Sequence, residues 1–580
     1  MATETWKEVC RRKREEQAAS IPTTWLLPSL PPASTLNVLG IPRTCGLLSE
    51  KELEITELDD IAQLLESIET GKWSSVQVVT AFAKRACIAH QLTNCLTEIF
   101  IDKALERARW LDDYLKTEGK PIGPLHGLPI SLKDQFCIKG LDTVMGYAAW
   151  VGKTAEEDCT LVSLLLELGA IPYVRTNVPQ TLMWGETYNN VYLRTVNPYN
   201  RLLTPGGSSG GEGALLALHG SPLGVGTDIG GSVRIPATWC GLYSLRPSYN
   251  RLPYQGACNS FEGFEAVPSV LGPMAHSLPA LKTFTKAIVN AKPWDWDPEA
   301  VRKLWSEREE KLDEHGQGKG LCFGILWDDG LVRVHPPVGR ALEMTKAAVE
   351  AAGHTVIEWK HYKPLEIRAV LNALFLSDGG TDFVAHTSLP PHELLLTTVF
   401  PRPDSPFSHP SLALPPPAEN TLLLPHPSIP VHELYSLHVE KRQLAKGFLD
   451  AWISSRTRTG TGRPVDALLA PVMATPAPPH GRNAYDFYCE YWNVVDCPCV
   501  VLPVTKVNPE VDRKEPAWEW RCQEERVVHE LYEPELFRDM PVGIQVIGRK
   551  QEEEAVLSIA QLVDDALKSH AVAKQDELES

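Results

Sequence analysis

Residues Pro205–Pro236 read PGGSSGGEGALLALHGSPLGVGTDIGGSVRIP, and this stretch decides how the rest of the chain is interpreted. Two Gly-Gly-Ser turns flank a segment whose pattern predicts a helix at Gly213–His219 and a strand at Leu223–Val225. Glycines beside hydroxyls let the backbone approach a ligand closely and leave its N–H groups free. The stretch therefore points to acyl-transfer chemistry.

Outside this stretch, helical and strand-like patterns alternate. Apolar residues spaced by three and four predict amphipathic helices at Ile55–Thr70, Ser75–Gln91 and Asp102–Leu115. The further predicted helices are Thr160–Leu168 and Glu553–Leu567, and the predicted strands are Gly127–Leu132, Ala170–Val174, Leu223–Val225, Ala467–Ala470, Val500–Val504 and Val542–Ile547. This alternation predicts an α/β fold, with a mixed sheet covered by helices.

Composition excludes several classes of function. The net charge of −17 argues against a nucleic-acid partner, because binding to phosphates needs a basic face. The 13 cysteines form no Cys-x-x-Cys pair, which predicts reduced thiols in a cytoplasmic protein without a structural zinc site. No apolar run reaches about 18 residues, so no integral membrane segment is expected. No cofactor or metal is predicted.

We expect one domain over 1–580, although about 150 residues per domain would suggest several. Its parts are an N-terminal helical lead-in (1–70, with a capping box at Thr5–Glu8), a catalytic core (75–250) and a C-terminal part completing the sheet (431–570). The segment 388–430 holds 12 of the 47 prolines, which predicts a surface insertion without regular structure. Its leucine triplets, Leu394–Leu396 and Leu422–Leu424, suggest that it packs against something rather than extending freely, and we hypothesise a lid or hydrophobic entrance.

The two Gly-Gly-Ser turns suggest separate roles. Ser209–Glu212 fits a capping box, which would start a helix and place Ser208 just before its N-terminus. Thr227–Ser232 predicts a tight turn whose successive N–H groups converge on one oxygen, as an oxyanion hole requires.

A serine nucleophile needs a base. His126 and His219 are the nearest histidines in sequence, but neither lies in a partner motif. A Gly-x-Ser-x-Gly elbow is found only by taking Ser209 as its centre. The alternative is a lysine kept neutral by desolvation, and Lys133 closes an apolar strand where it could be drawn inward.

Gly206–Ala237 is very similar to the signature of the amidase signature family of Ser-Ser-Lys hydrolases. The stretches 123–134, 176–180 and 541–548 agree with this family as well, and Lys133, Ser208 and Ser232 are separated by 75 and 24 residues as in its members. Nearly end to end, the chain resembles the acetamidase-type amidases of filamentous fungi. The resemblance implies a large mixed twisted β-sheet covered by helices on both faces.

The resemblance also implies a catalytic triad. Ser232 is the expected nucleophile, Ser208 connects it to the base Lys133 and contributes to substrate binding, and the Gly207–Ser208 peptide bond is expected to be cis. Hydrolysis would pass through an acyl-enzyme on Ser232.

Further residues take supporting roles by the same resemblance. The expected oxyanion hole consists of the N–H groups of Ile229, Gly230, Gly231 and Ser232. The residues expected to support the loops are Gly207, Ser209, Thr227, Asp228 and Arg234, of which Asp228 and Arg234 form an ion pair. Those expected to line the acyl pocket are Leu182, Met183 and Trp184, which could equally be simple core.

The leading interpretation is an amidase that hydrolyses small-molecule amides to a carboxylate and ammonia or an amine. The alternatives are a glutaminase-type subunit of a tRNA-dependent amidotransferase, a fatty acid amide or aryl anilide hydrolase, and a catalytically inactive binding protein. The resemblance favours a homodimer, because many relatives are dimeric.

Overall fold

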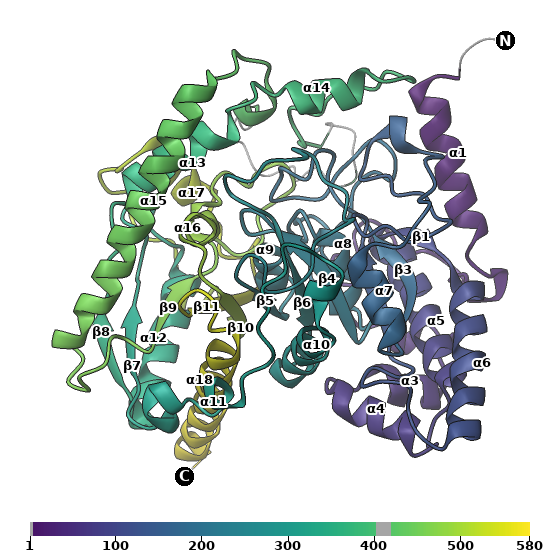
Figure 1. The fold of residues 1–580 in the computed structure, drawn as a ribbon, viewed down its shortest axis with the longest axis horizontal. Coiled ribbons are helices and arrows are strands. Elements are labelled where there is room, and N and C mark those ends of the chain that lie inside the picture. Colours follow the sequence, from purple (N-terminus) through teal and green to yellow (C-terminus); the bar gives the residue numbers. More distant parts are fainter. Residues whose placement is uncertain (1–3, 402–405, 407–418, 580) are drawn as a thin grey trace.

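A mixed β-sheet runs through the centre of the molecule (Figure 1). The structure is a computed structural model that describes residues 4–401, 406 and 419–579. Within them, eleven strands form one sheet in the order β1-β3-β2-β4-β6-β5-β10-β11-β9-β7-β8. The strands are β1 Leu96–Ile99, β2 Pro129–Lys133, β3 Ile171–Thr176, β4 Leu223–Asp228, β5 Tyr243–Arg246, β6 Val270–Ala275, β7 Cys322–Ile325, β8 Thr355–Glu358, β9 Ala467–Pro471, β10 Cys499–Lys506 and β11 Pro541–Ile547.

Parallel and antiparallel pairs alternate in blocks across this sheet. The pairs β3·β2, β2·β4, β9·β7 and β7·β8 are parallel, and the remaining neighbours are antiparallel. Every residue of β2 to β7, β9 and β11 is buried. Since the side chains of a strand alternate between its two faces, both faces of the sheet are covered. The predicted α/β fold is confirmed.

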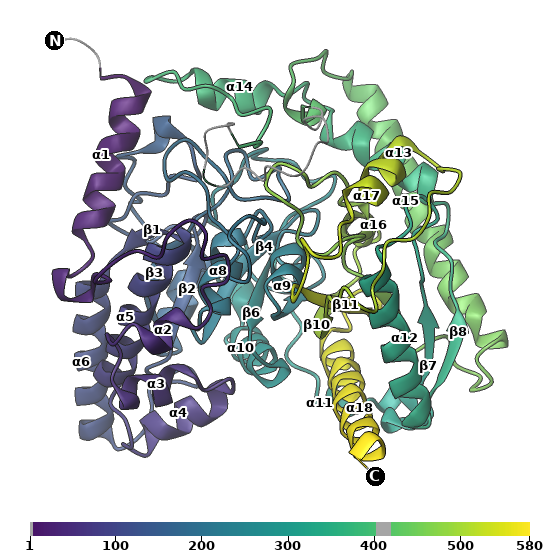
Figure 2. The same cartoon turned by 180° about the vertical axis from the view of Figure 1, so that it is seen from behind.

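Helices of very different length supply this cover (Figures 1 and 2). They are α1 Trp6–Ala19, α2 Ile41–Thr44, α3 Glu50–Thr56, α4 Ile61–Glu69, α5 Ser75–Thr93, α6 Ile101–Glu118, α7 Thr160–Glu167, α8 Gly210–Ala217, α9 Arg234–Trp239, α10 Leu278–Asn290, α11 Glu307–Glu310, α12 Pro336–Ala351, α13 Pro364–Phe375, α14 Thr381–Ser388, α15 Val431–Ser454, α16 Phe487–Val495, α17 Gln523–Leu531 and α18 Glu553–Glu579. In Figures 1 and 2, α5 and α6 lie at the β1 end of the sheet and α13 and α15 at the β8 end. Among the described residues, no helix is both long and apolar enough to span a bilayer.

One predicted helix was wrong. Ile55–Thr70 is interrupted, because α3 ends at Thr56 and α4 begins at Ile61. The Asp60 side chain accepts a hydrogen bond from the Ala62 N–H and caps α4. A capping aspartate competes with a continuous helix at this point, although the apolar spacing continues across it. The capping box at Thr5 and Glu8 is present as predicted.

The segment 388–430 packs on the core through both of its described ends. Its central part, which includes three consecutive prolines at Pro415–Pro417, lies outside the described residues. On one side of it, the Glu393 carboxylate accepts hydrogen bonds from the Ala148 N–H and from Gln180 and Asn190. On the other side, Leu423 is fully buried in a cluster with Phe261 and Phe383.

Leu423→Ala is expected to loosen this segment. Removing a buried leucine costs about 2–5 kcal/mol, and the loss falls on the contact between the segment and the core. Limited proteolysis should therefore cut within 388–430 faster than in the wild type. Leu394→Ala is the matched control, because that side chain is 68% exposed. Equal cleavage of the two variants would contradict this account.

Candidate active site

Three parallel strands end at the same edge of the sheet and bring their last residues together. β2 lies between β3 and β4, with Lys133 and Asp228 at the carboxyl ends of β2 and β4. The carboxyl edge of parallel strands is where α/β folds place their ligands. At this edge, Lys133 Nζ lies 2.6 Å from Ser208 Oγ and 2.7 Å from Thr227 Oγ1, both at hydrogen-bond distance.

Burial controls the charge of Lys133. Its side chain is fully buried, and this burial holds the pKa of the amine well below its usual range. Asp228 and Glu212 act in the opposite direction, but burial dominates. Lys133 therefore points into the interior, as its place at the end of an apolar strand predicted.

The two histidines considered as bases are engaged elsewhere. His126 Nδ1 accepts a hydrogen bond from the Ile122 N–H, and the His219 ring stacks on His276 at 4.0 Å.

The Gly207–Ser208 peptide bond is cis, as the resemblance implies. A Cβ at Gly207 would lie 2.5 Å from the backbone oxygen of Trp184 and from the backbone nitrogen and oxygen of Glu186. These are backbone atoms that cannot move aside easily, so only glycine fits. The Gly-Gly-Ser turn was expected to bring its backbone close to a ligand. At Gly207 the close contact is instead with the backbone of the protein itself.

The predicted capping box at Ser209 and Glu212 is absent. α8 begins at Gly210, and the Ser209 side chain makes no capping hydrogen bond. Glu212 instead accepts from the Ser131 hydroxyl at 2.6 Å and from the Thr176 hydroxyl at 2.9 Å. Burial raises the pKa of this carboxyl to about 8. The carboxyl is thus bound by Ser131 in the middle of β2 and by Thr176 at the end of β3.

Thr227 belongs to a hydrogen-bond chain in which one member was not predicted from the sequence. Its hydroxyl donates to Gln135 Oε1 at 2.5 Å. The Gln135 amide nitrogen donates to the carbonyl of Cys258 at 2.7 Å and to Asn259 Oδ1 at 2.8 Å, which fixes the orientation of the amide. Gln135 follows the Lys133-Asp134 pair directly, but nothing in a single glutamine indicates such a role.

The turn after β4 presents free N–H groups beside Ser232. Among the described residues, the N–H groups of Ile229, Gly230 and Ser232 have no hydrogen-bond acceptor. The Gly231 N–H departs from the expectation, because it donates to Asp228 Oδ1 at 2.8 Å. Three of the four expected N–H groups thus remain available.

Asp228 and Arg234 form a buried ion pair that braces this turn. Both side chains are fully buried, and Arg234 Nη2 lies 3.0 Å from Asp228 Oδ1. Burial raises the pKa of Asp228, but the Arg234 guanidinium outweighs it and holds the pKa below its usual range. Asp228 also accepts from the Val233 N–H and from Asn493, so one carboxylate connects the turn, α9 and α16.

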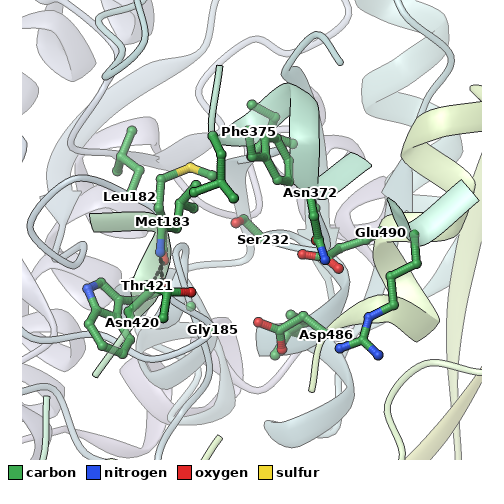
Figure 3. Close-up of a pocket in the computed structure, with 18 residues that line it drawn as sticks. Leu182, Met183, Gly185, Ser232, Asn372, Phe375, Asn420, Thr421, Asp486 and Glu490 are labelled. Carbon is green, nitrogen blue, oxygen red and sulfur yellow. Dashed lines mark hydrogen bonds between the residues drawn. The ribbon is translucent and has the colours of Figure 1, made fainter. Parts of the chain in front are cut away.

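Ser232 opens into a pocket of about 310 Å³. Its lining includes all three residues expected for the acyl pocket (Leu182, Met183 and Trp184), together with Gly207, Ile229 and Gly230. Ser208, which was expected to contribute to substrate binding, is not part of this lining, and its hydroxyl contacts Lys133. Figure 3 shows the Ser232 hydroxyl directed into the space between Met183 on one side and Glu490 on the other. The residues around the pocket that the sequence did not indicate are Gly185, Ile235, Arg368, Asn372, Phe375, Leu376, Asn420, Thr421, Asp486 and Glu490. Leu422, from one of the two leucine triplets, also lines it.

One wall of the pocket carries two carboxyl groups, Asp486 directly before α16 and Glu490 within it. Asp486 and Glu490 are partly buried, and burial raises the pKa of each; repulsion from Asp486 raises the pKa of Glu490 further. Opposite them, Asn420 donates a hydrogen bond to the Met183 carbonyl and so anchors the segment 388–430 at the pocket (Figure 3). The pocket is therefore half polar, with hydrogen-bonding groups facing Ser232.

Comparison with known proteins agrees with this arrangement. The model of the Amidase family matches residues 77–557. The acetamidase of Emericella nidulans is 40% identical over 97% of this chain and 98% of its own, and that of Aspergillus oryzae is 38% identical over 98% and 100%. A solved fatty acid amide hydrolase superposes with a TM-score of 0.86 at 32% identity, covering 96% of this chain and 94% of its own.

Fold, site and relatives together define an enzyme that hydrolyses amides. The chain belongs to the amidase signature family.

Asp228→Asn is expected to lower thermal stability, because Arg234 would keep its charge without a counter-ion at a cost of about 3–5 kcal/mol. The Asp228 contribution is complete above the unfolded-state pKa of about 3.9 and declines as the pH falls below it. The gap in Tm between wild type and variant should therefore narrow below about pH 4. Asp59→Asn, on a side chain 64% exposed, serves as control and should leave Tm unchanged. A gap that widens in acid would contradict the assignment.

Proposed function

We propose that this chain hydrolyses small carboxylic amides through a Ser232–Ser208–Lys133 triad and an acyl-enzyme. The observation that carries the proposal is the 2.6 Å contact between the fully buried Lys133 amine and Ser208, whose neighbour Gly207 lines the pocket together with Ser232. A desolvated lysine can act as a base near neutral pH, where an exposed one is protonated.

The hydrogen bonds around Thr227 orient the lone pair of the lysine. Thr227 has one hydroxyl hydrogen, and it is given to Gln135 Oε1. Thr227 must therefore accept from the Lys133 amine. The neutral amine, with Thr227 holding one of its hydrogens, can direct its lone pair at Ser208, which is the direction a proton relay needs.

In the proposed reaction, Ser208 passes a proton between Ser232 and Lys133. Among the described residues, the Ser208 hydroxyl contacts Lys133 and no hydrogen bond joins it to the Ser232 hydroxyl, so that second contact is proposed to form during the reaction. Lys133 takes the Ser208 proton while Ser208 takes the proton of Ser232, and Ser232 Oγ attacks the amide carbonyl. The carbonyl oxygen becomes an oxyanion that the N–H groups of Ile229, Gly230 and Ser232 stabilise. The relay then returns a proton to the leaving nitrogen, the C–N bond breaks, and water hydrolyses the ester on Ser232.

The polar wall of the pocket supports a short or polar acyl group. A long apolar chain lying against Glu490 and Asn372 would displace water from these groups without offering a hydrogen bond, and Asp486 would keep only its contact with Asn483. This favours an acetamidase-like substrate over a fatty amide, although one of the solved structures similar to this chain is a fatty acid amide hydrolase. Acetamidase relatives over nearly the full chain likewise favour a free-standing enzyme over an amidotransferase subunit. A cytoplasmic location and a homodimer remain predictions.

Ser232→Ala and Lys133→Ala are each expected to lower kcat on acetamide to background, because the nucleophile or its base is lost. Ser208→Ala should lose less, since water can partly replace a bridging hydroxyl. Steady-state kinetics on the purified variants measure this, with circular dichroism to verify folding.

Ser244→Ala is the matched control, since it removes a buried hydroxyl without a hydrogen-bond partner on β5. Lys133→Arg tests the base, because guanidinium keeps the positive charge and cannot accept a proton. Substantial turnover in Ser232→Ala or Lys133→Arg would reject the triad.

Glu490→Leu is expected to shift substrate preference toward longer acyl chains. Replacing the carboxyl with an apolar group should raise the ratio of kcat/KM for hexanamide to that for acetamide about tenfold. Glu490→Gln keeps the size and polarity and should leave the ratio near the wild-type value. If both variants show the wild-type ratio, this wall does not select the acyl group.

A further inference from the structure

Two cysteines stand close enough to react with each other outside the pocket. Cys137 Sγ and Cys258 Sγ are 3.3 Å apart, and they come from segments 121 residues apart in the sequence. All 13 cysteines of the chain are free thiols. A disulfide has an S–S length of about 2.05 Å, so these two sulfurs need to approach by only about 1.3 Å.

Both thiols are reachable from solvent. Each residue is partly exposed, and Cys258 lines a surface cavity of about 390 Å³ with Trp150, Tyr254 and Asn259. A small oxidant can therefore enter beside the pair.

The surroundings of Cys137 favour its thiolate. The Cys258 thiol is positioned to donate a hydrogen bond to it, and the Thr143 hydroxyl donates a weaker one at 3.7 Å. Arg175, whose guanidinium holds Thr143 at 2.9 Å, adds positive charge nearby. These partners hold the pKa of Cys137 below its usual range, with the Cys258 contact as the largest cause.

The pair is connected to the catalytic lysine. The Cys258 backbone exchanges two hydrogen bonds with Gln135: its N–H donates to the Gln135 carbonyl, and its carbonyl accepts from the Gln135 amide. Gln135 in turn accepts from Thr227, which contacts Lys133. Three hydrogen bonds thus lead from the Cys258 backbone to the proposed base.

We propose that Cys137 and Cys258 form an oxidisable dithiol site that closes to a disulfide with a peroxide and thereby lowers the amidase activity. The effect on activity rests on the proposed function, whereas formation of the disulfide does not. Closure pulls Cys258 toward Cys137 and shifts the carbonyl that orients Gln135. Thr227 then loses its fixed acceptor and can no longer set the direction of the Lys133 lone pair.

The step balances with hydrogen peroxide as the oxidant. The Cys137 thiolate attacks one peroxide oxygen, the O–O bond breaks, and the leaving hydroxide takes up the thiol proton as water. Cys258 sulfur then attacks the Cys137 sulfenic acid, the S–S bond forms, the S–O bond breaks, and a second water leaves with the Cys258 proton. Two thiols are oxidised by two electrons, and one peroxide is reduced to two waters.

The test treats the reduced, full-length enzyme with hydrogen peroxide and maps its peptides without reductant. We expect a cross-linked peptide pair joining Cys137 to Cys258, lighter by two hydrogens than the two separate peptides. Activity on acetamide should fall about tenfold or more, as expected when a catalytic group is misplaced, and should return with dithiothreitol.

Matched variants separate this pair from other thiols. Cys137→Ser and Cys258→Ser should form no such cross-link, whereas Cys522→Ser, which removes a partly exposed thiol elsewhere, should behave as the wild type. The dithiol site is overturned if peroxide oxidises Cys522 in the wild type while Cys137 and Cys258 stay unlinked. A cross-link that leaves activity unchanged overturns the connection to Lys133.

Discussion

The whole site depends on keeping one amine uncharged at the end of a buried strand. Among the residues that the structure describes, Lys133 has hydrogen bonds to two hydroxyls and none to a carboxylate, so burial is not offset by a close counter-ion. A carboxylate bonded directly to this amine would favour the ammonium form and remove the base. Of the two acidic residues whose charge acts on this amine, Glu212 accepts hydrogen bonds from Ser131 and Thr176 and has a raised pKa. The protein thus favours the uncharged form of Glu212 as well as that of Lys133.

Asp228, the residue after Thr227, is stabilised in its charged form instead. Its charge is kept, since Arg234, Asn493 and the turn's own N–H groups all donate to it. The Gly231 N–H is bound to this carboxylate and is therefore not available to a substrate. The same contact holds the neighbouring N–H groups in place before a substrate arrives, and such preorganised donors are the effective ones. A charged bracing pair and an uncharged base therefore lie at the ends of adjacent strands.

Much of this could be read from the sequence because the informative residues are clustered. The turns at 206–211 and 227–232 and the strand end at 133 carry recognisable patterns, and the alternation of apolar runs predicted the sheet. One error comes from tertiary partners: Ser209 and Glu212 fit a local capping pattern, yet Ser131 and Thr176 bind the glutamate in the interior. The other error is local, because Asp60 caps the start of α4 where the apolar spacing predicts one continuous helix.

Other parts of the site lie beyond any local pattern. Asp486 and Glu490 reach the pocket from α16, far along the chain, and Asn420 reaches it from a segment that the sequence marks only as proline-rich. The Gln135 amide accepts a hydrogen bond from Thr227 and donates one to the Cys258 carbonyl, and neither contact can be predicted from the sequence. Such residues gain their roles only when the sheet brings distant segments to one edge.

The charge of Lys133 can be measured directly. NMR of the enzyme carrying lysine labelled with ¹³C at Cε, with the Lys133 signal assigned by its loss in Lys133→Arg, follows that amine through a pH titration. The account predicts the chemical shift of a neutral amine at pH 7 and protonation only at lower pH. A Lys133 signal that titrates near the ordinary lysine pKa of about 10.4 would contradict it.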